Sequence, residues 1–233
     1  MAKHGNRAAT GKCGSADVLS AAGLNLDAPP EVMEACIAEH GIGFLFAAKM
    51  HPIMGNMRLI RKELGIPTAF NLLGPLINPA GAKRQLLGVY SPDLTELFAE
   101  VLRELGSKRA MVVHGMDGLD EISCFAPTRV TELNNGEIRT SELLPELYVG
   151  DVSDPSELQG GDPAENAQIM LNILNGSDHS SRRKVVLLNA GAVILTAGLA
   201  EDLHDGVNQA ANAIDSGNAF AKFQALLEAA NAC

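Results

Sequence analysis

The sequence is short of basic residues. Its 233 residues include 18 lysines and arginines but 28 aspartates and glutamates, which gives a formal net charge of −10. An acidic surface repels the phosphates of nucleic acids and of anionic lipids, so we expect neither of them as a partner. Any site for a phosphorylated ligand must therefore be a local basic pocket in an otherwise acidic protein.

No apolar run is long enough to predict a transmembrane helix. The longest mainly apolar stretch, 185–200, contains Asn189 and Thr196 and falls short of the roughly 20 residues that a span needs. The first residues lack the charged-then-apolar pattern of a secretory signal peptide. The cysteines form no C-x-x-C pair and are irregularly spaced, as is typical of free thiols in a reducing compartment: Cys13, Cys36, Cys124 and Cys233. We therefore expect a cytoplasmic protein that does not bind membranes.

The common catalytic signatures are also absent from the sequence. It contains no H-E-x-x-H zinc motif and no G-x-x-x-x-G-K-[ST] phosphate loop, and its spacing assembles no Ser-His-Asp triad. Histidine is the usual general base, and His4, His51 and His114 lie in or near candidate loops. What is present is a composition of 46% apolar and 20% charged residues, which predicts a globular protein with a full core.

Strand-like and helix-like patterns alternate along the chain, which predicts an α/β fold with a parallel-type central sheet. We expect strands at 42–47, 85–90 and 110–113, and a β-hairpin that turns at Asn134-Asn135-Gly136. In the first half of the chain, the expected helices run from Ser15 to Gly23, from an Asp27 cap to Gly41, from His51 to Leu64 and from Ser91-Pro92 to Gly106. In the second half, one helix runs from Asp162-Pro163 to about Gly176, and three more cover 180–198, 200–215 and 218–231. Ser216 is expected to cap the last of them. No linker divides the chain, so we expect one domain over 1–233.

The run Lys3-His4-Gly5-Asn6-Arg7 concentrates hydrogen-bond donors around a glycine. The donors continue through Thr10, Gly11 and Lys12 to the expected helix start at Ser15. Backbone N–H groups and the helix dipole favour an anion at such a place. The run therefore predicts an anion-binding loop, although a solvated basic arm has the same composition.

Two adjacent carboxylates, Asp120 and Glu121, follow the expected strand at 110–113 through a glycine-containing turn. Ligands of open α/β sheets bind beyond the carboxyl ends of strands, where this turn should lie. One or two carboxylates suit Mg²⁺, which takes its other ligands from substrate phosphates and water. The pair predicts a magnesium site, and an exposed acidic loop is the alternative.

Two further segments contain candidate binding residues. The stretch 70–79 reads as a buried, non-helical loop, and its Asn71 and Asn78 side chains need partners in the backbone or in a ligand. On the expected helix 51–64, Arg58 and Arg61 share a face, and a guanidinium grips a carboxylate in a bidentate manner. The spacing alone does not choose between the two arginines.

Taken in order, these runs resemble the anthranilate phosphoribosyltransferase family. The matching text is Lys-His-Gly-Asn-Arg at 3–7, Gly-Ser-Ala-Asp at 14–17, Phe-Asn-Leu-Leu-Gly-Pro-Leu-Ile-Asn-Pro-Ala at 70–80, His-Gly-Met-Asp-Gly-Leu-Asp-Glu at 114–121 and Leu-Leu-Asn-Ala-Gly-Ala at 187–192. The resemblance implies a central sheet flanked by helices, like that of nucleoside phosphorylases and phosphoribosyltransferases, with an incomplete small helical domain. It also implies a homodimer.

The resemblance implies transfer of the 5-phosphoribosyl group from 5-phosphoribosyl 1-diphosphate to the amine of anthranilate, a step of tryptophan biosynthesis that needs Mg²⁺. It implies no protein nucleophile, since the work is positioning and charge stabilisation. The residues expected to bind 5-phosphoribosyl 1-diphosphate are Lys3, His4, Gly5, Asn6, Arg7, Ala8, Ala9, Thr10, Gly11 and Ser15. Those expected to bind anthranilate are Asn6, His51, Arg61 and Gly74, and those expected to hold Mg²⁺ are Asp120 and Glu121.

The chain also departs from the family pattern. The family's Gly-Thr-Gly-Gly-Asp phosphate loop and N-terminal helices would precede Lys3, and this sequence does not contain them. We therefore expect a truncated copy with impaired activity. Three alternatives remain: a pyrimidine nucleoside phosphorylase-like enzyme, a non-catalytic binding protein on the same scaffold, and a nucleic-acid-binding relative, against which the net charge of −10 argues.

Overall fold

The computed structural model describes residues 1–8, 13–52, 70–150 and 154–232. The chain forms two compact units, each assembled from segments that are far apart in the sequence. Unit 1 comprises Met1–Gly81, Gly160–Leu174 and Asn218–Cys233, and unit 2 comprises Ala82–Gln159 and Asn175–Gly217. A single domain over 1–233 stays a prediction.

Unit 1 is built around two short parallel strands, β1 (Ala2–Gly5) and β2 (Gly43–Phe46), in which Lys3 pairs with Phe44. Among its described residues, the helices of this unit are α1 (Ser15–Ala21), α2 (Pro30–His40), α3 (Ala47–Met50), α5 (Phe70–Leu73), α8 (Pro163–Leu174) and α11 (Asn218–Asn231), with a 3-10 turn η1 (Gly74–Leu76). Within it α2 packs on β2 and α11, and α1 packs on α8.

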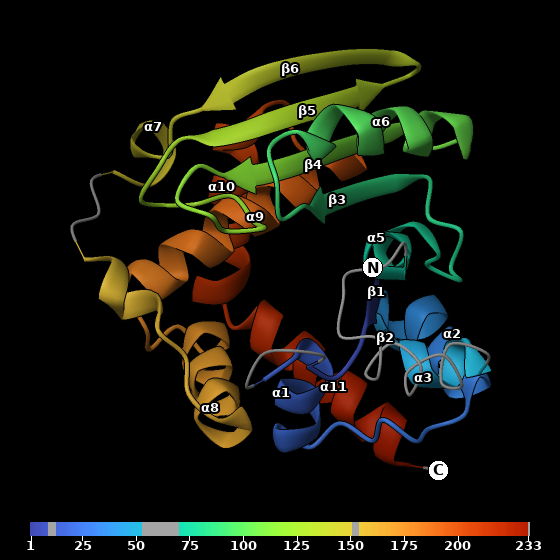
Figure 1. Cartoon of the computed structure of the whole chain (residues 1–233). Helices are drawn as coiled ribbons and strands as arrows, with labels where there is room; N and C mark the ends of the chain where they lie inside the picture. The colour runs from blue at the N-terminus through green and yellow to red at the C-terminus, as the bar shows by residue number, and fades with distance from the viewer. Residues whose placement is uncertain (9–12, 53–69, 151–153, 233) are drawn as a thin grey trace, which may run out of the picture. The chain divides into compact units, whose positions relative to one another are not determined.

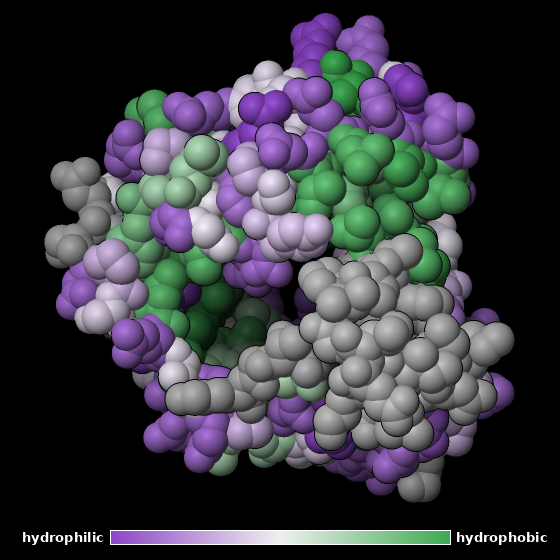
Figure 2. Space-filling model, in the orientation of Figure 1, coloured by the Kyte–Doolittle hydropathy of each residue, from purple (hydrophilic) through white to green (hydrophobic). Residues whose placement is uncertain are grey.

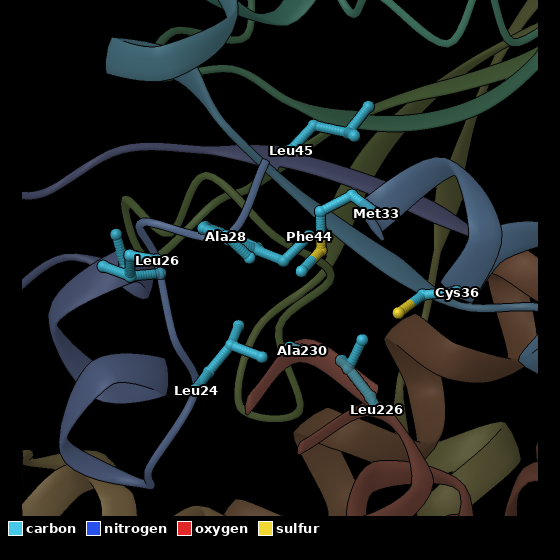
Figure 3. Packing of buried hydrophobic residues seen from close by; sticks show 10 residues of the cluster. Leu24, Leu26, Ala28, Met33, Cys36, Phe44, Leu45, Leu226 and Ala230 are labelled. Atoms are coloured by element: carbon cyan, nitrogen blue, oxygen red, sulfur yellow. The ribbon is translucent and has the colours of Figure 1, made fainter. Parts of the chain in front are cut away.

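The core of unit 1 joins the two ends of the chain. Leu24 and Phe44 are buried against Leu226 and Ala230 of α11, and α2 contributes Met33 to the same cluster (Figure 3). Burying side chains of this size contributes about 1.5–3 kcal/mol each. The C-terminal helix is therefore an integral part of the unit that contains the first strand.

Unit 2 contains a four-stranded sheet in the order β3-β4-β5-β6 (Figure 1). Its strands are β3 (Arg84–Gly88), β4 (Arg109–Gly115), β5 (Thr128–Asn134) and β6 (Glu137–Leu143). The β3–β4 pair is parallel, but β4–β5 and β5–β6 are antiparallel. The prediction of a parallel-type sheet is confirmed for β1–β2 and β3–β4 and is wrong for β4 to β6.

Helices cover both faces of this sheet. Every residue of β4 from Ala110 to Gly115 is buried, which requires cover on both sides. One side is covered by α6 (Leu94–Glu104) and the other by α9 (Ser181–Ala197), backed by α10 (Leu203–Asp215) (Figure 1). The remaining elements of unit 2 are α7 (Glu146–Val149) and the 3-10 turn η2 (Pro155–Leu158).

The strand β6 forms an edge of the sheet and has a polar character that fits this position. Four of its residues in a row, Arg139 to Glu142, are exposed. Figure 2 shows mainly hydrophilic atoms over this edge of the molecule. Charged side chains on an edge strand oppose pairing with the edge of another chain.

Several local predictions are confirmed and three are wrong. The hairpin turn at Asn135-Gly136 forms with positive φ at both residues, and α9, α10 and α11 lie where helices were expected. Pro29 rather than Asp27 is the N-cap of α2. Ser216 ends α10 instead of capping α11. The stretch 70–79 is not the expected non-helical loop, because α5 and η1 lie in it.

The expected helix 51–64 falls mostly outside the described residues.

Among the helices that the structure describes, none combines the length and the apolar character that crossing a bilayer requires.

Candidate functional site

The donor run, Lys3 to Arg7, begins inside a strand rather than on a free arm. Lys3, His4 and Gly5 belong to β1 and pair in register with β2. Asn6 and Arg7 follow directly at the carboxyl end of β1 and are exposed. Residues that are hydrogen-bonded into a sheet are held in one orientation, whereas a solvated arm would not hold them so.

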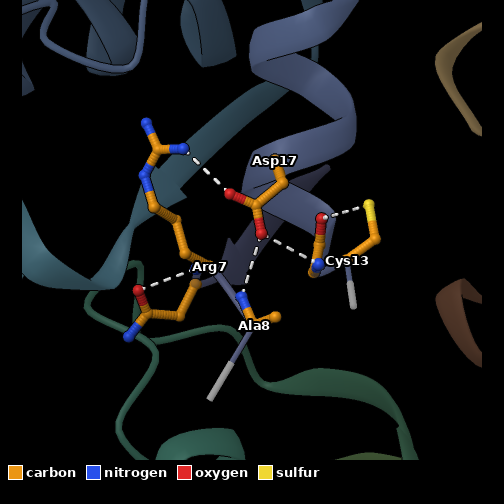
Figure 4. A network of polar contacts seen from close by, with 6 residues as sticks. Arg7, Ala8, Cys13 and Asp17 are labelled. Atoms are coloured by element: carbon orange, nitrogen blue, oxygen red, sulfur yellow. Dashed lines mark hydrogen bonds and ion pairs between the residues drawn. The ribbon is translucent and has the colours of Figure 1, made fainter. Parts of the chain in front are cut away.

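Asp17 closes the loop that connects β1 to α1 (Figure 4). Its Oδ2 accepts hydrogen bonds from the backbone N–H groups of Ala8 and Gly14, both at 3.0 Å, and its Oδ1 accepts one from Arg7 Nη1 at 2.8 Å. Ala8 lies before the loop and Gly14 after it, so one carboxylate ties both ends together. A side chain at Gly14 would obstruct this closure, since a β-carbon there would lie 2.5 Å from Ala8 N.

These hydrogen bonds stabilise the ionised form of Asp17. The N–H groups of Ala8 and Gly14 lower the pKa of this carboxyl, and the Arg7 guanidinium lowers it further. Asp17 lies in one of the matching motifs, but the sequence predicted no role for it. The available signal was its position as the third residue of α1 after the Gly14 N-cap, where an acidic side chain reaches back to the cap N–H.

Arg7 has protein partners in addition to any ligand. Its guanidinium pairs with Asp17 and lies over the Phe46 ring, with Cζ 5.9 Å from the ring centroid. Half of the Arg7 side chain remains exposed, at 52%. A guanidinium carries five N–H donors, so N–H groups remain for an anion. The residue can therefore bind an anion while it stays anchored to Asp17.

His4 is held beside Gly74 and His51. Its Nδ1 donates to the Gly74 carbonyl at 3.2 Å, and its ring meets the His51 ring edge-on with centroids 5.2 Å apart. Burial lowers the pKa of His4, the hydrogen bond to Gly74 opposes that change, and His51 adds to the lowering. Nε2 of each ring is buried and has no hydrogen-bond partner within the described residues. Three residues that the sequence assigned to substrates therefore lie together in unit 1.

Asn78 has only backbone partners among the described residues. Its Nδ2 donates to the Ala2 carbonyl at 3.1 Å, and its Oδ1 accepts from Ala80 N at 3.0 Å. Of the two explanations left open for this asparagine, the structure thus supports the one in which it binds the backbone. This amide fixes the segment after η1 against β1.

In unit 2 the acidic loop, residues 116–127, connects β4 to β5 and contains Asp120 and Glu121. A hydrogen bond within the loop stabilises it, because Ser123 Oγ donates to Asp117 Oδ2 at 2.6 Å. Ser123 Oγ in turn accepts from Phe125 N at 2.9 Å and from Ala126 N at 3.2 Å. These contacts give the loop one defined shape.

The end of β3 touches the acidic loop directly. A β-carbon on Gly88 would overlap the carbonyl oxygen of Asp120. Only glycine lets the two backbones approach this closely. The position of Asp120 thus depends on a residue for which the sequence predicted no role.

The two carboxylates fit a hard divalent cation. Asp120 and Glu121 are adjacent and both exposed at the bend of the braced loop. Among the residues that the structure describes, no group of three or more His, Cys, Asp and Glu side chains gathers around one point. A site with two carboxylates suits Mg²⁺, which keeps waters and substrate oxygens as its other ligands.

His114 and Cys124 have structural partners near the acidic loop. His114 is buried, and its Nδ1 donates to the Val89 carbonyl at 2.8 Å. Cys124 is also buried, and its thiol donates to the Ser181 carbonyl at 3.7 Å. Burial raises the pKa of Cys124 to about 11. A thiol that stays protonated is not a nucleophile at neutral pH.

We expect the Cys124 thiol to react at least about 100-fold more slowly in the native protein than in the unfolded chain at pH 8, because a rise of two pKa units lowers the thiolate fraction by that factor. The measurement is the rate of reaction with 5,5′-dithiobis(2-nitrobenzoate) in a Cys13→Ser/Cys36→Ser/Cys233→Ser variant, in buffer and in denaturant. Equal rates in both would contradict the prediction.

Some predicted site residues lie outside the described residues: Ala9, Thr10, Gly11 and Arg61. The other residues divide between the units. The donor run, Ala8, Ser15, His51 and Gly74 belong to unit 1, and Asp120 and Glu121 belong to unit 2.

Comparison with known proteins gives a consistent result. The family described as "Glycosyl transferase family, a/b domain" matches residues 1–220. An anthranilate phosphoribosyltransferase of Desulfosudis oleivorans is 54% identical over 98% of this chain and 67% of its own length. The chain thus spans about two thirds of the length of this relative.

Solved structures give the same match. The anthranilate phosphoribosyltransferase of Thermus thermophilus has a TM-score of 0.92 and 43% identity, over 99% of this chain and 68% of that one. The Saccharomyces cerevisiae enzyme in complex with PRPP (5-phosphoribosyl 1-diphosphate) and Mg has a TM-score of 0.91 and 28% identity, over 100% of this chain and 65% of that one.

Proposed function

Since this chain belongs to the anthranilate phosphoribosyltransferase family, we propose that it transfers the 5-phosphoribosyl group from 5-phosphoribosyl 1-diphosphate to the amine of anthranilate and releases diphosphate. The observation that carries the proposal is 54% identity to a relative of that name over 98% of the chain. The retained donor run and acidic loop agree with it, since both kinds of substrate-binding chemistry are present.

The donor run and the start of α1 bind 5-phosphoribosyl 1-diphosphate in this proposal. Lys3 on β1, together with Asn6 and Arg7 just after its carboxyl end, offers exposed donors. Asp17 holds Ala8 and Gly14, the two ends of the loop that leads to Ser15, through their backbone N–H groups. Ala9, Thr10 and Gly11 complete the predicted set. A loop whose two ends are joined before the ligand arrives loses less entropy on binding than a flexible arm does.

Asp120 and Glu121 hold Mg²⁺ in this proposal. The cation, when bound, supplies positive charge that stabilises the diphosphate as it leaves. The Mg reported with the Saccharomyces cerevisiae relative supports this assignment. The contacts of Asp117 with Ser123 and of Gly88 with the Asp120 backbone support this assignment, because they restrain the loop that bears both carboxylates.

Asn6, His51, Gly74 and Arg61 bind anthranilate in this proposal. His4 and His51 present buried Nε2 atoms that have no hydrogen-bond partner in the described part of the chain. Because Nδ1 of His4 carries the proton that it donates to Gly74, its Nε2 is an acceptor when the ring is neutral. The lowered pKa of His4 favours that neutral form. His4 itself belongs to the set assigned to 5-phosphoribosyl 1-diphosphate, and it contacts Gly74 and His51 of the anthranilate set.

The chemistry needs no nucleophile from the protein. The bond between the anomeric carbon and the diphosphate oxygen breaks, the bond from the amine nitrogen to that carbon forms, and the amine releases a proton to water. Bringing the two substrates together contributes on the order of 7–11 kcal/mol to lowering the barrier. The homodimer, the cytoplasmic location and the tryptophan pathway stay predictions.

The test is the decrease of anthranilate fluorescence when the purified chain meets 5-phosphoribosyl 1-diphosphate and Mg²⁺. We expect a decrease that stops on chelation of Mg²⁺ and that is at least about 10-fold slower in an Asp120→Ala/Glu121→Ala variant, because the leaving group then lacks its counter-charge. Phosphorolysis of thymidine is the parallel assay for the alternative enzyme class. A folded chain that neither consumes anthranilate nor binds 5-phosphoribosyl 1-diphosphate in calorimetry contradicts the proposal.

A further inference from the structure

The side-chain amide of Asn189, in the middle of α9, makes three hydrogen bonds that use its oxygen and both N–H donors. Its Oδ1 accepts from Ile122 N at 3.0 Å, and its Nδ2 donates to the Ile122 carbonyl at 2.9 Å and to the Val185 carbonyl at 2.9 Å. The amide thus pairs with both backbone groups of one residue, as a neighbouring strand would. Such a pair fixes the distance of Ile122 from the helix and also its rotation.

Ile122 is the residue directly after the two carboxylates. It is completely buried, whereas Asp120 and Glu121 are exposed. The chain therefore enters the core at this residue, and the position of its backbone determines where Glu121 begins. A shift of Ile122 moves the carboxylates with it.

The helix that carries Asn189 is itself firmly placed. Gly191 lies against α10 so closely that a β-carbon on it would be 2.7 Å from Val207 N. The same helix packs on β3 and β4. Because a functional group is held more precisely by a packed helix than by a loop, α9 is a suitable support for Asn189.

The acidic loop is thus held from two sides within unit 2. The backbone of Gly88 in β3 touches Asp120, and the amide of Asn189 in α9 binds Ile122. Both contacts reach the segment 120–122 and neither uses a carboxylate of Asp120 or Glu121. The contacts therefore leave the carboxylates where they are exposed and fix the backbone that bears them.

We infer that Asn189 is a positioning residue for the cation site formed by Asp120 and Glu121. The inference rests on the proposed function, which assigns Mg²⁺ to these carboxylates. Asn189 acts through the backbone of Ile122 and does not touch the cation. Loss of a residue that orients metal ligands typically weakens metal binding about 10- to 100-fold. Asn189 lies in the matching motif 187–192, for which the sequence offered no role.

The test measures the binding of Mn²⁺, a paramagnetic substitute for Mg²⁺. Protein is titrated into Mn²⁺, and the electron paramagnetic resonance signal of the remaining free ion is recorded. We expect Asn189→Ala to raise the Mn²⁺ dissociation constant about 10-fold. The matched control is Asn212→Ala, which removes the same side chain from an exposed position of α10 and should stay within about twofold of the unsubstituted chain. Circular dichroism and the melting temperature establish that each variant is folded.

The outcomes separate this inference from the proposed function. Asn189→Ala with unchanged Mn²⁺ affinity, beside an Asp120→Ala/Glu121→Ala variant that has lost binding, overturns the inference and leaves the cation site intact. Equal Mn²⁺ binding by the unsubstituted chain and the double variant overturns the cation site, and the inference with it. If Asn189→Ala does not fold, the Mn²⁺ dissociation constant of Asn189→Asp tests the inference in its place. This variant keeps the size of the side chain and the acceptor for Ile122 N but loses both N–H donors.

Discussion

A Gly88→Ala variant is expected to be at least about 3 kcal/mol less stable than the unsubstituted chain and to melt roughly 6–12 °C lower. The cause is local. The added methyl group would overlap the carbonyl oxygen of Asp120, which belongs to the backbone and cannot rotate away as a side-chain end would. Either β3 or the acidic loop must move, and β3 is fixed by its register with β4, where Gly88 pairs with Val113.

Differential scanning calorimetry measures this effect, and Gly74→Ala is the matched control. Within the described residues, no atom lies within 4 Å of the position that a β-carbon on Gly74 would take. The control should therefore melt close to the unsubstituted chain. Gly88→Ala should also bind Mn²⁺ more weakly, because displacement of Asp120 changes the geometry of the carboxylates. A variant that melts within about 1 °C of the unsubstituted chain would show that the loop and the strand have room to adjust.

An Asp17→Ala variant is expected to bind 5-phosphoribosyl 1-diphosphate about 100-fold more weakly. The carboxylate accepts three hydrogen bonds, two of them from the opposite ends of the loop between Ala8 and Gly14. Allowing about 1 kcal/mol for each, a value reduced for exposure to solvent, the loss is about 3 kcal/mol. The loop then has to be ordered by the ligand, which lowers affinity by that amount.

Isothermal titration calorimetry with 5-phosphoribosyl 1-diphosphate measures the loss, with Asp27→Ala as control. Asp27 is another aspartate of unit 1 that pairs with a cation, Lys49, but it is 88% exposed and accepts no hydrogen bond from Ala8 or Gly14. Asp17→Asn keeps one acceptor oxygen, so its affinity for 5-phosphoribosyl 1-diphosphate should lie between those of Asp17→Ala and Asp27→Ala. Unchanged affinity in Asp17→Ala would mean that the loop binds the ligand without being closed.

Asp17 should also make stability depend on acidity. Because the hydrogen bonds of Ala8 and Gly14 lower its pKa in the folded state, its contribution is complete above the pKa of an unfolded aspartate, about 3.9. The contribution is lost as the pH falls through the lower folded value. The stability difference between the unsubstituted chain and Asp17→Asn should therefore shrink below about pH 4.

The sequence predicted those elements of the fold whose signals are local. Asn135-Gly136 predicted the hairpin, and apolar stretches with clear ends predicted β4 and the three C-terminal helices. The antiparallel pairing of β4 with β5 was missed because periodicity identifies a strand but not the direction of its neighbour. The helical turns over Phe70–Leu76 were missed because the stretch 70–79 was interpreted as a non-helical loop, although a proline such as Pro75 is tolerated in the first turn of a helix.

For the candidate site, the sequence indicated the residues that the proposal assigns to ligands, but it did not indicate the residues that contact and support them. Lys3, Asp120 and their neighbours carry charges and motifs that can be recognised singly. Asn189 lies 67 residues from Ile122, and Gly88 approaches Asp120 from another strand. Contacts of this kind depend on tertiary packing, which no local spacing encodes.

Unit 1 joins the first and last parts of the chain, and this affects folding during synthesis on the ribosome. Asn231 bonds to Asn25 and Gly23, and Leu226 and Ala230 complete a core whose other members lie among the first 45 residues. A ribosome adds about 5–20 residues per second, so the roughly 140 residues between Gly81 and Asn218 take about 7–28 s to synthesise. Throughout that time the nascent chain holds Leu24 and Phe44 without their covering helix, and those apolar side chains are available to chaperones. Residues 82–217 include all of unit 2, so its sheet can form first, while unit 1 closes only after α11 has emerged.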